Sequence, residues 1–217
     1  RYQPTPSEPA YSLGQGRFAV SPLREREEVL SPRRAVTGNG ATSRRRSRVR
    51  LGKEPSVLSY DLQAILAESS ARHSHLCPRQ VLGARIGIAG ATSLGLNLPR
   101  TGKRLLIFVE SDGCFADGVE AATGCTMGHR TLRLEDYGKI AAVFVDVKNE
   151  RAVRVAPRLD VRERAYAYAP GERRHYFAQL QGYQVMPADE LLTIQRVALT
   201  TPVAPIVSRP TVRTPCE

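Results

Sequence analysis

The stretch Ala71–Gly83, ARHSHLCPRQVLG, decides the fold, because a segment rich in metal-binding side chains passes directly into a helix there. His73, His75 and Cys77 alternate, and alternate side chains of an extended segment point to the same side. Pro78 favours a helix start, since the first helical position needs no N–H donor. We therefore expect Cys77 at or near the N-cap, where the helix dipole favours a thiolate.

Two neutral imidazoles and a thiolate are ligands that zinc prefers. We expect the fourth ligand from the loop after the next strand, with Cys114 first and Asp112 or Asp117 next. Three protein ligands and a water would also form a coherent zinc site. The alternative is structural: one histidine caps a helix and Cys77 is a small buried apolar residue. The predicted metal ligands are His73, His75, Cys77 and Cys114.

The sequence on both sides of this stretch predicts alternating helices and strands. Apolar residues recur at helical spacing from Ser56, a plausible cap, to about Arg72, and again over about 78–94. Gly83, Gly87 and Gly90 in the second helix favour close packing against another backbone, of this chain or of a symmetry mate. Further expected elements are strands at 104–109, 131–134 and 191–199, a β-hairpin at 140–147 and 152–156, and helices at 115–123, 159–168 and 172–183.

These elements predict a single α+β core domain, a mixed helix and sheet structure, at 56–199. The chain has 217 residues and a net charge of +11, of which residues 1–55 carry 12 basic and 5 acidic side chains. We expect 1–55 to be a disordered basic tail, because it has too few apolar residues to fold, and 200–217 to be a short flexible tail. The arginine run at 44–50 makes nucleic-acid binding an alternative, although a solvated tail explains it more simply.

The sequence also indicates the cellular compartment of the protein and the redox state of its cysteines. It has no apolar run of 18 residues and no signal peptide, so we expect no membrane span. It begins with Arg1, so an upstream piece can be missing. The four cysteines, at 77, 114, 125 and 216, do not form a regular disulfide framework. We therefore predict a cytoplasmic protein with reduced thiols.

Four separate motifs give the chain a resemblance to a known family. They are HSHLCP at 73–78, ESDGCFAD at 110–117, TGCTMG at 123–128 and DYGK at 136–139. In this order and spacing they resemble the FmdE family, named after a component of formylmethanofuran dehydrogenase. Ser74 and Arg79 stand where the family has glycines, and only Cys216 follows residue 125, so the four-cysteine zinc ribbon of many relatives is absent.

The resemblance implies an α+β core, a zinc site and a homodimer. It also implies an accessory or sensor role beside a molybdenum or tungsten oxidoreductase of one-carbon metabolism, with a molybdopterin-type cofactor as a further ligand. A small zinc enzyme acting on a carbonyl or pterin-like substrate is the alternative, with Cys114 or Asp112 as candidate catalytic residues and Glu110 as another possible base. Whether the chain is an enzyme stays open at this point.

The remaining motif residues give weaker expectations. Lys139 and Thr126 are candidate cofactor-binding residues, because a lysine can neutralise a phosphate or carboxylate; Lys139 is alternatively a charge that protects a strand edge. Cys125 follows the helix expected at 115–123, whose ends lie about 13 Å apart, so it should not share the metal of Cys114 within one protomer. It has a separate role, approaches a partner's site, or is a buried thiol.

Overall fold

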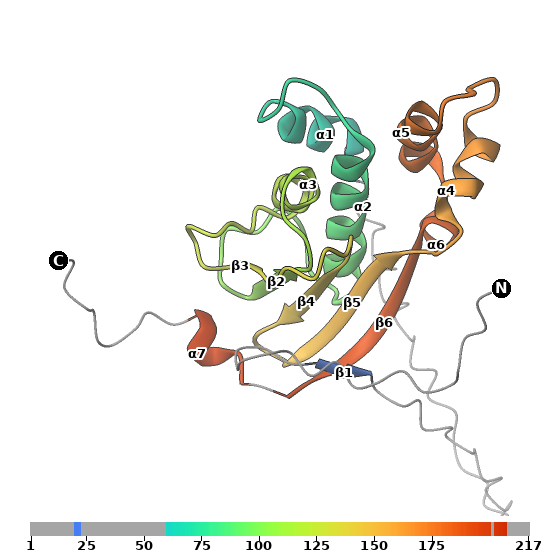
Figure 1. Ribbon diagram of the computed structural model, residues 1–217. Helices are drawn as coiled ribbons and strands as arrows, with labels where there is room; N and C mark the ends of the chain where they lie inside the picture. Colours follow the sequence, from blue (N-terminus) through green and yellow to red (C-terminus); the bar gives the residue numbers. More distant parts are fainter. Residues whose placement is uncertain (1–19, 23–59, 201, 208–217) are drawn as a thin grey trace, which may run out of the picture. The chain divides into compact units, whose positions relative to one another are not determined.

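A six-stranded mixed sheet is the base on which the helices pack (Figure 1). The computed structural model describes residues 20–22, 60–200 and 202–207. The strand order is β1-β6-β5-β4-β2-β3, in which β2 and β3 are parallel and the other neighbours antiparallel. The strands are β1 (Val20–Pro22), β2 (Leu105–Val109), β3 (Leu132–Leu134), β4 (Ala142–Asp146), β5 (Arg151–Pro157) and β6 (Leu192–Leu199).

The central strands are apolar on both faces because both faces are covered. All five residues of β2 are buried, and successive side chains alternate between two clusters. Leu105, Ile107 and Val109 join the main core under α2, while Leu106 and Phe108 join a smaller cluster on the opposite face. The β4–β5 hairpin follows the predicted pattern, so the apolar runs identified these strands correctly.

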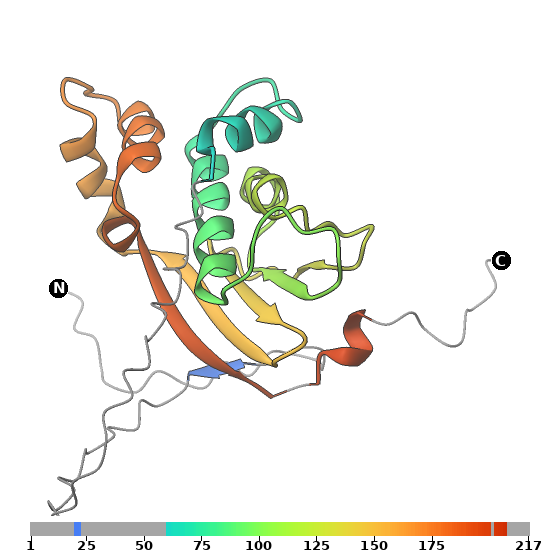
Figure 2. The same cartoon turned by 180° about the vertical axis from the view of Figure 1, so that it is seen from behind.

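All helices but α7 fall into two groups (Figures 1 and 2). The first three lie over one face of the sheet, and a second group stands between β5 and β6 in the chain. The short α7 adds Ile206 and Val207 to the smaller cluster on the other face. The helices are α1 (Leu62–Ser70), α2 (Pro78–Ser93), α3 (Cys114–Thr123), α4 (Val161–Arg164), the 3₁₀ helix η1 (Ala165–Tyr168), α5 (His175–Val185), α6 (Ala188–Leu191) and α7 (Ala204–Val207).

Helices α2 and α3 run parallel in very close contact. A Cβ added at Gly83 would overlap the carbonyl oxygen of Phe115, and one added at Gly118 would overlap that of Gln80. One α2 turn later, a Cβ at Gly87 would lie 3.0 Å from Ala122 Cβ. The contacts advance along both helices in the same direction, so the two helices start side by side. Gly83 and Gly87 thus approach this chain's own α3, not a symmetry mate, whereas a Cβ added at Gly90 would overlap the ring of Phe144 in β4.

The predicted α+β class is confirmed, with differences at the ends. Helix α1 starts at Leu62, where Asp61 Oδ1 accepts a hydrogen bond from Ala64 N at 3.1 Å, later than the predicted cap at Ser56. Strand β1 lies inside the segment expected to be a tail, and it pairs with β6. Helix α7 lies inside the expected C-terminal tail. The rest of 1–55, including the arginine run, and 208–217 lie outside the described residues.

Among the described residues, no helix combines the length and apolar character needed to cross a bilayer.

Candidate metal centre

The paired starts of α2 and α3 bring two thiols together. Cys77 is the N-cap of α2 and Cys114 is the first residue of α3. The two side chains are close enough to influence each other's charge, and both are free thiols. Each helix start carries partial positive charge from unpaired N–H groups, so both dipoles favour negative charge at this point.

Gln80 fixes Cys77 from inside the protein. Its Oε1 accepts a hydrogen bond from the backbone N–H of Cys77 at 2.8 Å. Its Nε2 donates to the carbonyl and hydroxyl oxygens of Ser69, at 3.1 and 3.2 Å, at the end of α1. Gln80 is fully buried, so it ties the turn between α1 and α2 to the first turn of α2. The position of Cys77 is therefore set by a buried polar network as well as by the helix start.

His73 is oriented by a carboxylate of α3. Its Nε2 lies 2.5 Å from Asp117 Oδ2, and both side chains are partly exposed. The neighbouring Arg72 forms an ion pair with Glu120, one turn further along α3. These two contacts fasten the turn that precedes Cys77 to the side of α3. A carboxylate on one ring nitrogen leaves Nδ1 as the nitrogen available to a ligand.

His75 does not join this arrangement. Its side chain is exposed, and its Nδ1 lies 3.0 Å from the hydroxyl oxygen of the adjacent Ser74. Within the described part of the chain, no three His, Cys, Asp or Glu side chains converge closely enough to hold an ion. The structure thus brings Cys77 to Cys114 and His73 to Asp117, and it leaves His75 apart.

Tyr176, at the start of α5, reaches the same place from a different part of the chain. Its hydroxyl donates to the carbonyl oxygen of Leu76 at 3.3 Å. Burial raises its pKa, and the nearby Cys77 and Cys114 raise it further. Burial raises the pKa of the Cys114 thiol, and its interaction with Cys77 raises that pKa further. The hydroxyl of Tyr176 thus contacts the residue that precedes Cys77.

The comparison with known families matches the region that builds this centre. A family model described as FmdE, molybdenum formylmethanofuran dehydrogenase operon, matches residues 72–193, more than half of the chain. The chain belongs to the FmdE family.

Two individual proteins are similar to this FmdE chain. A probable S-adenosyl-L-methionine-binding protein from Archaeoglobus fulgidus is 36% identical over 97 residues, which are 43% of this chain and 26% of that protein. The match thus spans about a quarter of that relative. The crystal structure of a tungsten formylmethanofuran dehydrogenase FmdE-like protein from Syntrophus aciditrophicus has a TM-score of 0.51 at 19% identity. It covers 70% of this chain and 78% of that protein, and it supports the fold alone.

Two of the other motifs, ESDGCFAD and TGCTMG, contribute residues to a hollow beside α3. The hollow has a volume of about 330 Å³ and an acidic side formed by Asp112, Asp117 and Glu120. Neither thiol lines it, so it lies on the carboxylate side of the α3 start. Its remaining wall consists of Val109, Gly113, Ala116, Met127, Gly128, Leu132 and Leu134.

The two predicted cofactor-binding residues differ in their surroundings. The hydroxyl of Thr126 accepts a hydrogen bond from the backbone N–H of His129 at 3.1 Å, so it orders the loop before β3. Lys139 is exposed, and its backbone N–H donates to the carbonyl of Glu110 at 3.0 Å. Cys125 is fully buried at the far end of α3 and its thiol donates to the carbonyl of Leu105 at 3.7 Å. Within this chain Cys125 is therefore remote from the Cys77–Cys114 pair.

Glu110 is occupied elsewhere. Arg154 donates to both of its carboxylate oxygens at 2.6 Å, on the sheet face opposite α2. The carboxylate of Glu110 is therefore paired with Arg154, and its role as a base stays a prediction.

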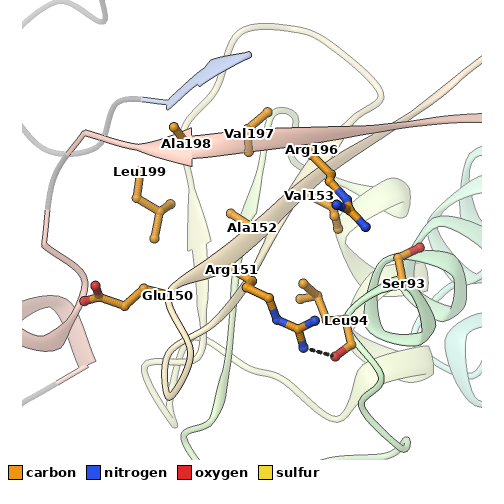
Figure 3. A pocket seen from close by; sticks show the side chains of 10 residues that line it. All are labelled: Ser93, Leu94, Glu150, Arg151, Ala152, Val153, Arg196, Val197, Ala198 and Leu199. Carbon is orange, nitrogen blue, oxygen red and sulfur yellow. Dashed lines mark hydrogen bonds between the residues drawn. The ribbon is translucent and has the colours of Figure 1, made fainter. Parts of the chain in front are cut away.

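A second hollow lies too far away to belong to the centre. Figure 3 shows it beside β5 and β6, with a volume of about 410 Å³ and the side chains of Arg151 and Arg196 on its wall. Arg151 donates to the carbonyl of Leu94 at 2.8 Å, just after the last residue of α2. A sixteen-residue helix is about 24 Å long, so this hollow and Cys77 lie at opposite ends of α2.

Sequence reasoning missed Gln80 and Tyr176 as parts of the centre. Gln80 stands three residues after an N-cap, the position from which a glutamine reaches back to the cap N–H, so its signal was readable. Tyr176 lies about 100 residues downstream and only the tertiary fold brings it to Leu76.

Proposed function

We propose that this FmdE chain binds a zinc ion through Cys77, Cys114 and His73, with Asp117 as the carboxylate that orients the histidine. The carrying observation is that two free thiols from separate helices meet at the paired starts of those helices. Two thiols and a carboxylate-bound imidazole fit zinc in kind, and metal-binding histidines usually donate their other nitrogen to such a group. His75, from the same turn, is the candidate for the fourth position.

The residues of the chain would prepare this site in separate ways. Gln80 holds the backbone of Cys77, Asp117 sets the tautomer and orientation of His73, and Tyr176 of α5 donates to the carbonyl of Leu76, the residue before Cys77. A bound zinc ion supplies fixed positive charge and Lewis acidity. Asp112, exposed on the wall of the hollow beside α3, is the group best placed to exchange protons with a small molecule there.

The experiment is a metal titration of the full chain. The reduced, metal-free protein is loaded with zinc, and with cobalt(II) as a spectroscopic substitute, and metal per chain is measured by mass spectrometry. We expect about one zinc per chain and a thiolate-to-cobalt absorption band. Cys77→Ser and Cys114→Ser should each lower affinity at least tenfold, whereas the matched Cys125→Ser should retain parent affinity.

Two results would refute the metal proposal. One is less than about a tenth of a zinc per chain; the other is equal affinity in the Cys114→Ser and Cys125→Ser proteins. His73→Ala and His75→Ala assign the remaining positions, because only a true ligand changes the cobalt spectrum.

Membership of the FmdE family supports an accessory or sensor role beside a molybdenum or tungsten oxidoreductase. The role predicts that cells lacking this chain lose activity of such an oxidoreductase, and that a copy without the Cys77 and Cys114 thiols does not restore it. Normal oxidoreductase activity without the chain would exclude the role. The proposed homodimer is tested separately by light scattering of the purified protein.

A small zinc-dependent enzyme is the second candidate, favoured by the hollow that Asp112 lines. The carboxylate of Asp112 also suits a cationic molecule, and the name of the Archaeoglobus relative makes S-adenosyl-L-methionine a ligand to test beside pterin-like compounds. Calorimetric titration of each compound should show binding that Asp112→Asn weakens at least threefold. Equal binding by Asp112→Asn, or none by the parent, would exclude this candidate.

A further inference from the structure

We propose that Cys77 and Cys114 form a reversible intramolecular disulfide when no metal occupies them, with a hydroperoxide as oxidant, so that metal binding and thiol oxidation exclude each other. The link to metal rests on the proposed function, but the disulfide requires only the two thiols. The site would thus respond to oxidants as well as to metal.

The helix pair supplies the geometry. A disulfide needs Cα atoms within about 4.4–6.8 Å, and packed helices with ordinary side chains at their contact hold their axes 8–10 Å apart. Here Gly83 and Gly118 remove the side chains from the contact, one to two turns after the cysteines. The parallel direction places both helix starts at the same end, with Cys77 as the N-cap of α2 and Cys114 as the first residue of α3.

Unequal exposure of the two thiols gives an order of events. Cys114 is partly exposed, whereas Cys77 is only 7% exposed. The Cys114 thiolate attacks the peroxide, so that an S–O bond forms, the O–O bond breaks and water or an alcohol leaves. The Cys77 thiol then attacks the sulfenic sulfur, an S–S bond forms, the S–O bond breaks and water leaves. Two thiols lose two electrons and two protons, and the hydroperoxide accepts them.

The third described thiol cannot compete. Cys125 is fully buried at the other end of α3, where its thiol donates to the carbonyl of Leu105. It therefore provides a matched control, a cysteine on the same peptide segment that should remain reduced. Cys216 lies outside the described residues and is replaced by serine in every test protein.

The experiment treats the metal-free, full-length Cys216→Ser protein with hydrogen peroxide and maps the products by mass spectrometry. Trypsin should release residues 73–79, HSHLCPR, joined to residues 105–130, which contain both Cys114 and Cys125. Fragmentation between the two cysteines should place the bond on Cys114, and a thiol reductant should reverse it. Cys114→Ser should abolish the joined peptide, and Cys125→Ser should leave its yield unchanged.

Several outcomes would overturn the inference. They are a joined peptide whose bond lies on Cys125, a bond between chains, or oxygen addition to Cys114 without a joined peptide. Peptide mapping of the Cys216→Ser protein decides the matter even where Cys114→Ser fails to fold. A joined peptide at parent yield in a folded Cys114→Ser protein would also refute it.

A second measurement separates this inference from the proposed function. The oxidised protein should bind at least tenfold less zinc than the reduced protein, and reduction should restore binding. If the disulfide forms but the reduced chain binds no zinc, the metal proposal fails and the disulfide stands. If zinc binds but no disulfide forms in the metal-free protein, the disulfide inference fails and the metal proposal stands.

Discussion

Substitution of Gly83 by alanine tests whether close contact between α2 and α3 holds the site together. The added Cβ would overlap the carbonyl oxygen of Phe115 and lie 3.0 Å from both Gly118 Cα and Val119 N. All three obstacles are backbone atoms, so the helices themselves must separate. Overpacking of this kind costs about 1–3 kcal/mol, and the upper end applies where no side chain can yield. Alanine regains about 1 kcal/mol as the better helix former.

The expected net loss is therefore about 2 kcal/mol in the free energy of unfolding. Urea denaturation measures it as a lower midpoint with an unchanged slope. Gly102→Ala is the matched control, because nothing lies within 4 Å of its Cβ, and it should stay within about 0.5 kcal/mol of the parent. A Gly83→Ala protein as stable as the parent would refute the contact. Where the variant folds, its disulfide yield should also fall, because the thiols move apart with the helices.

Three further predictions concern polar contacts. The hydrogen bond from Arg104 holds the pKa of the buried Asp146 below its ordinary value of 3.8. This stabilisation is complete above that value and is lost as the pH falls through the lower folded pKa. The unfolding free energies of the parent and Asp146→Asn should thus differ by about 2 kcal/mol at neutral pH and converge in acid; a constant difference contradicts this. Arg85 donates hydrogen bonds to three carbonyls at the end of α5. Thermal unfolding of Arg85→Lys should therefore show a loss of about 1.5–3 kcal/mol in the free energy of unfolding. An unchanged melting temperature contradicts this prediction. Glu110→Gln weakens the ion pair with Arg154 on the sheet face opposite α2, so it should lower the free energy of unfolding by about 1 kcal/mol or more. The number of zinc ions bound per chain should stay the same. Loss of zinc would place Glu110 in the metal site.

Individual strands and helix ends could be predicted from the sequence, because each depends on residues close together in the chain. The apolar run at 105–109 is a buried strand, Pro78 opens α2, and Gly124 ends α3 in a left-handed conformation with φ of 70°. The short β1 was not readable, because three residues carry little periodicity and its pairing with β6 comes from the other end of the chain.

The site was predictable in part for the same reason. Alternation in an extended segment predicted one shared face for His73, His75 and Cys77, but residues 71–75 turn instead, and the two imidazoles separate. Cys114 was identified from its place after a strand, and the structure puts it beside Cys77. Whether these residues bind zinc stays a prediction.

The bare contact between α2 and α3 has a consequence for comparing distant sequences. A chain can carry the same histidines and cysteines and still differ in chemistry, if a larger side chain stands at the position of Gly83 or Gly118. Its helices would then stand further apart, and its sulfur atoms would be too widely spaced to share one ion or one covalent bond. The size of the residues at those two positions, which carry no reactive group, therefore indicates whether the cysteines of the motif can come together.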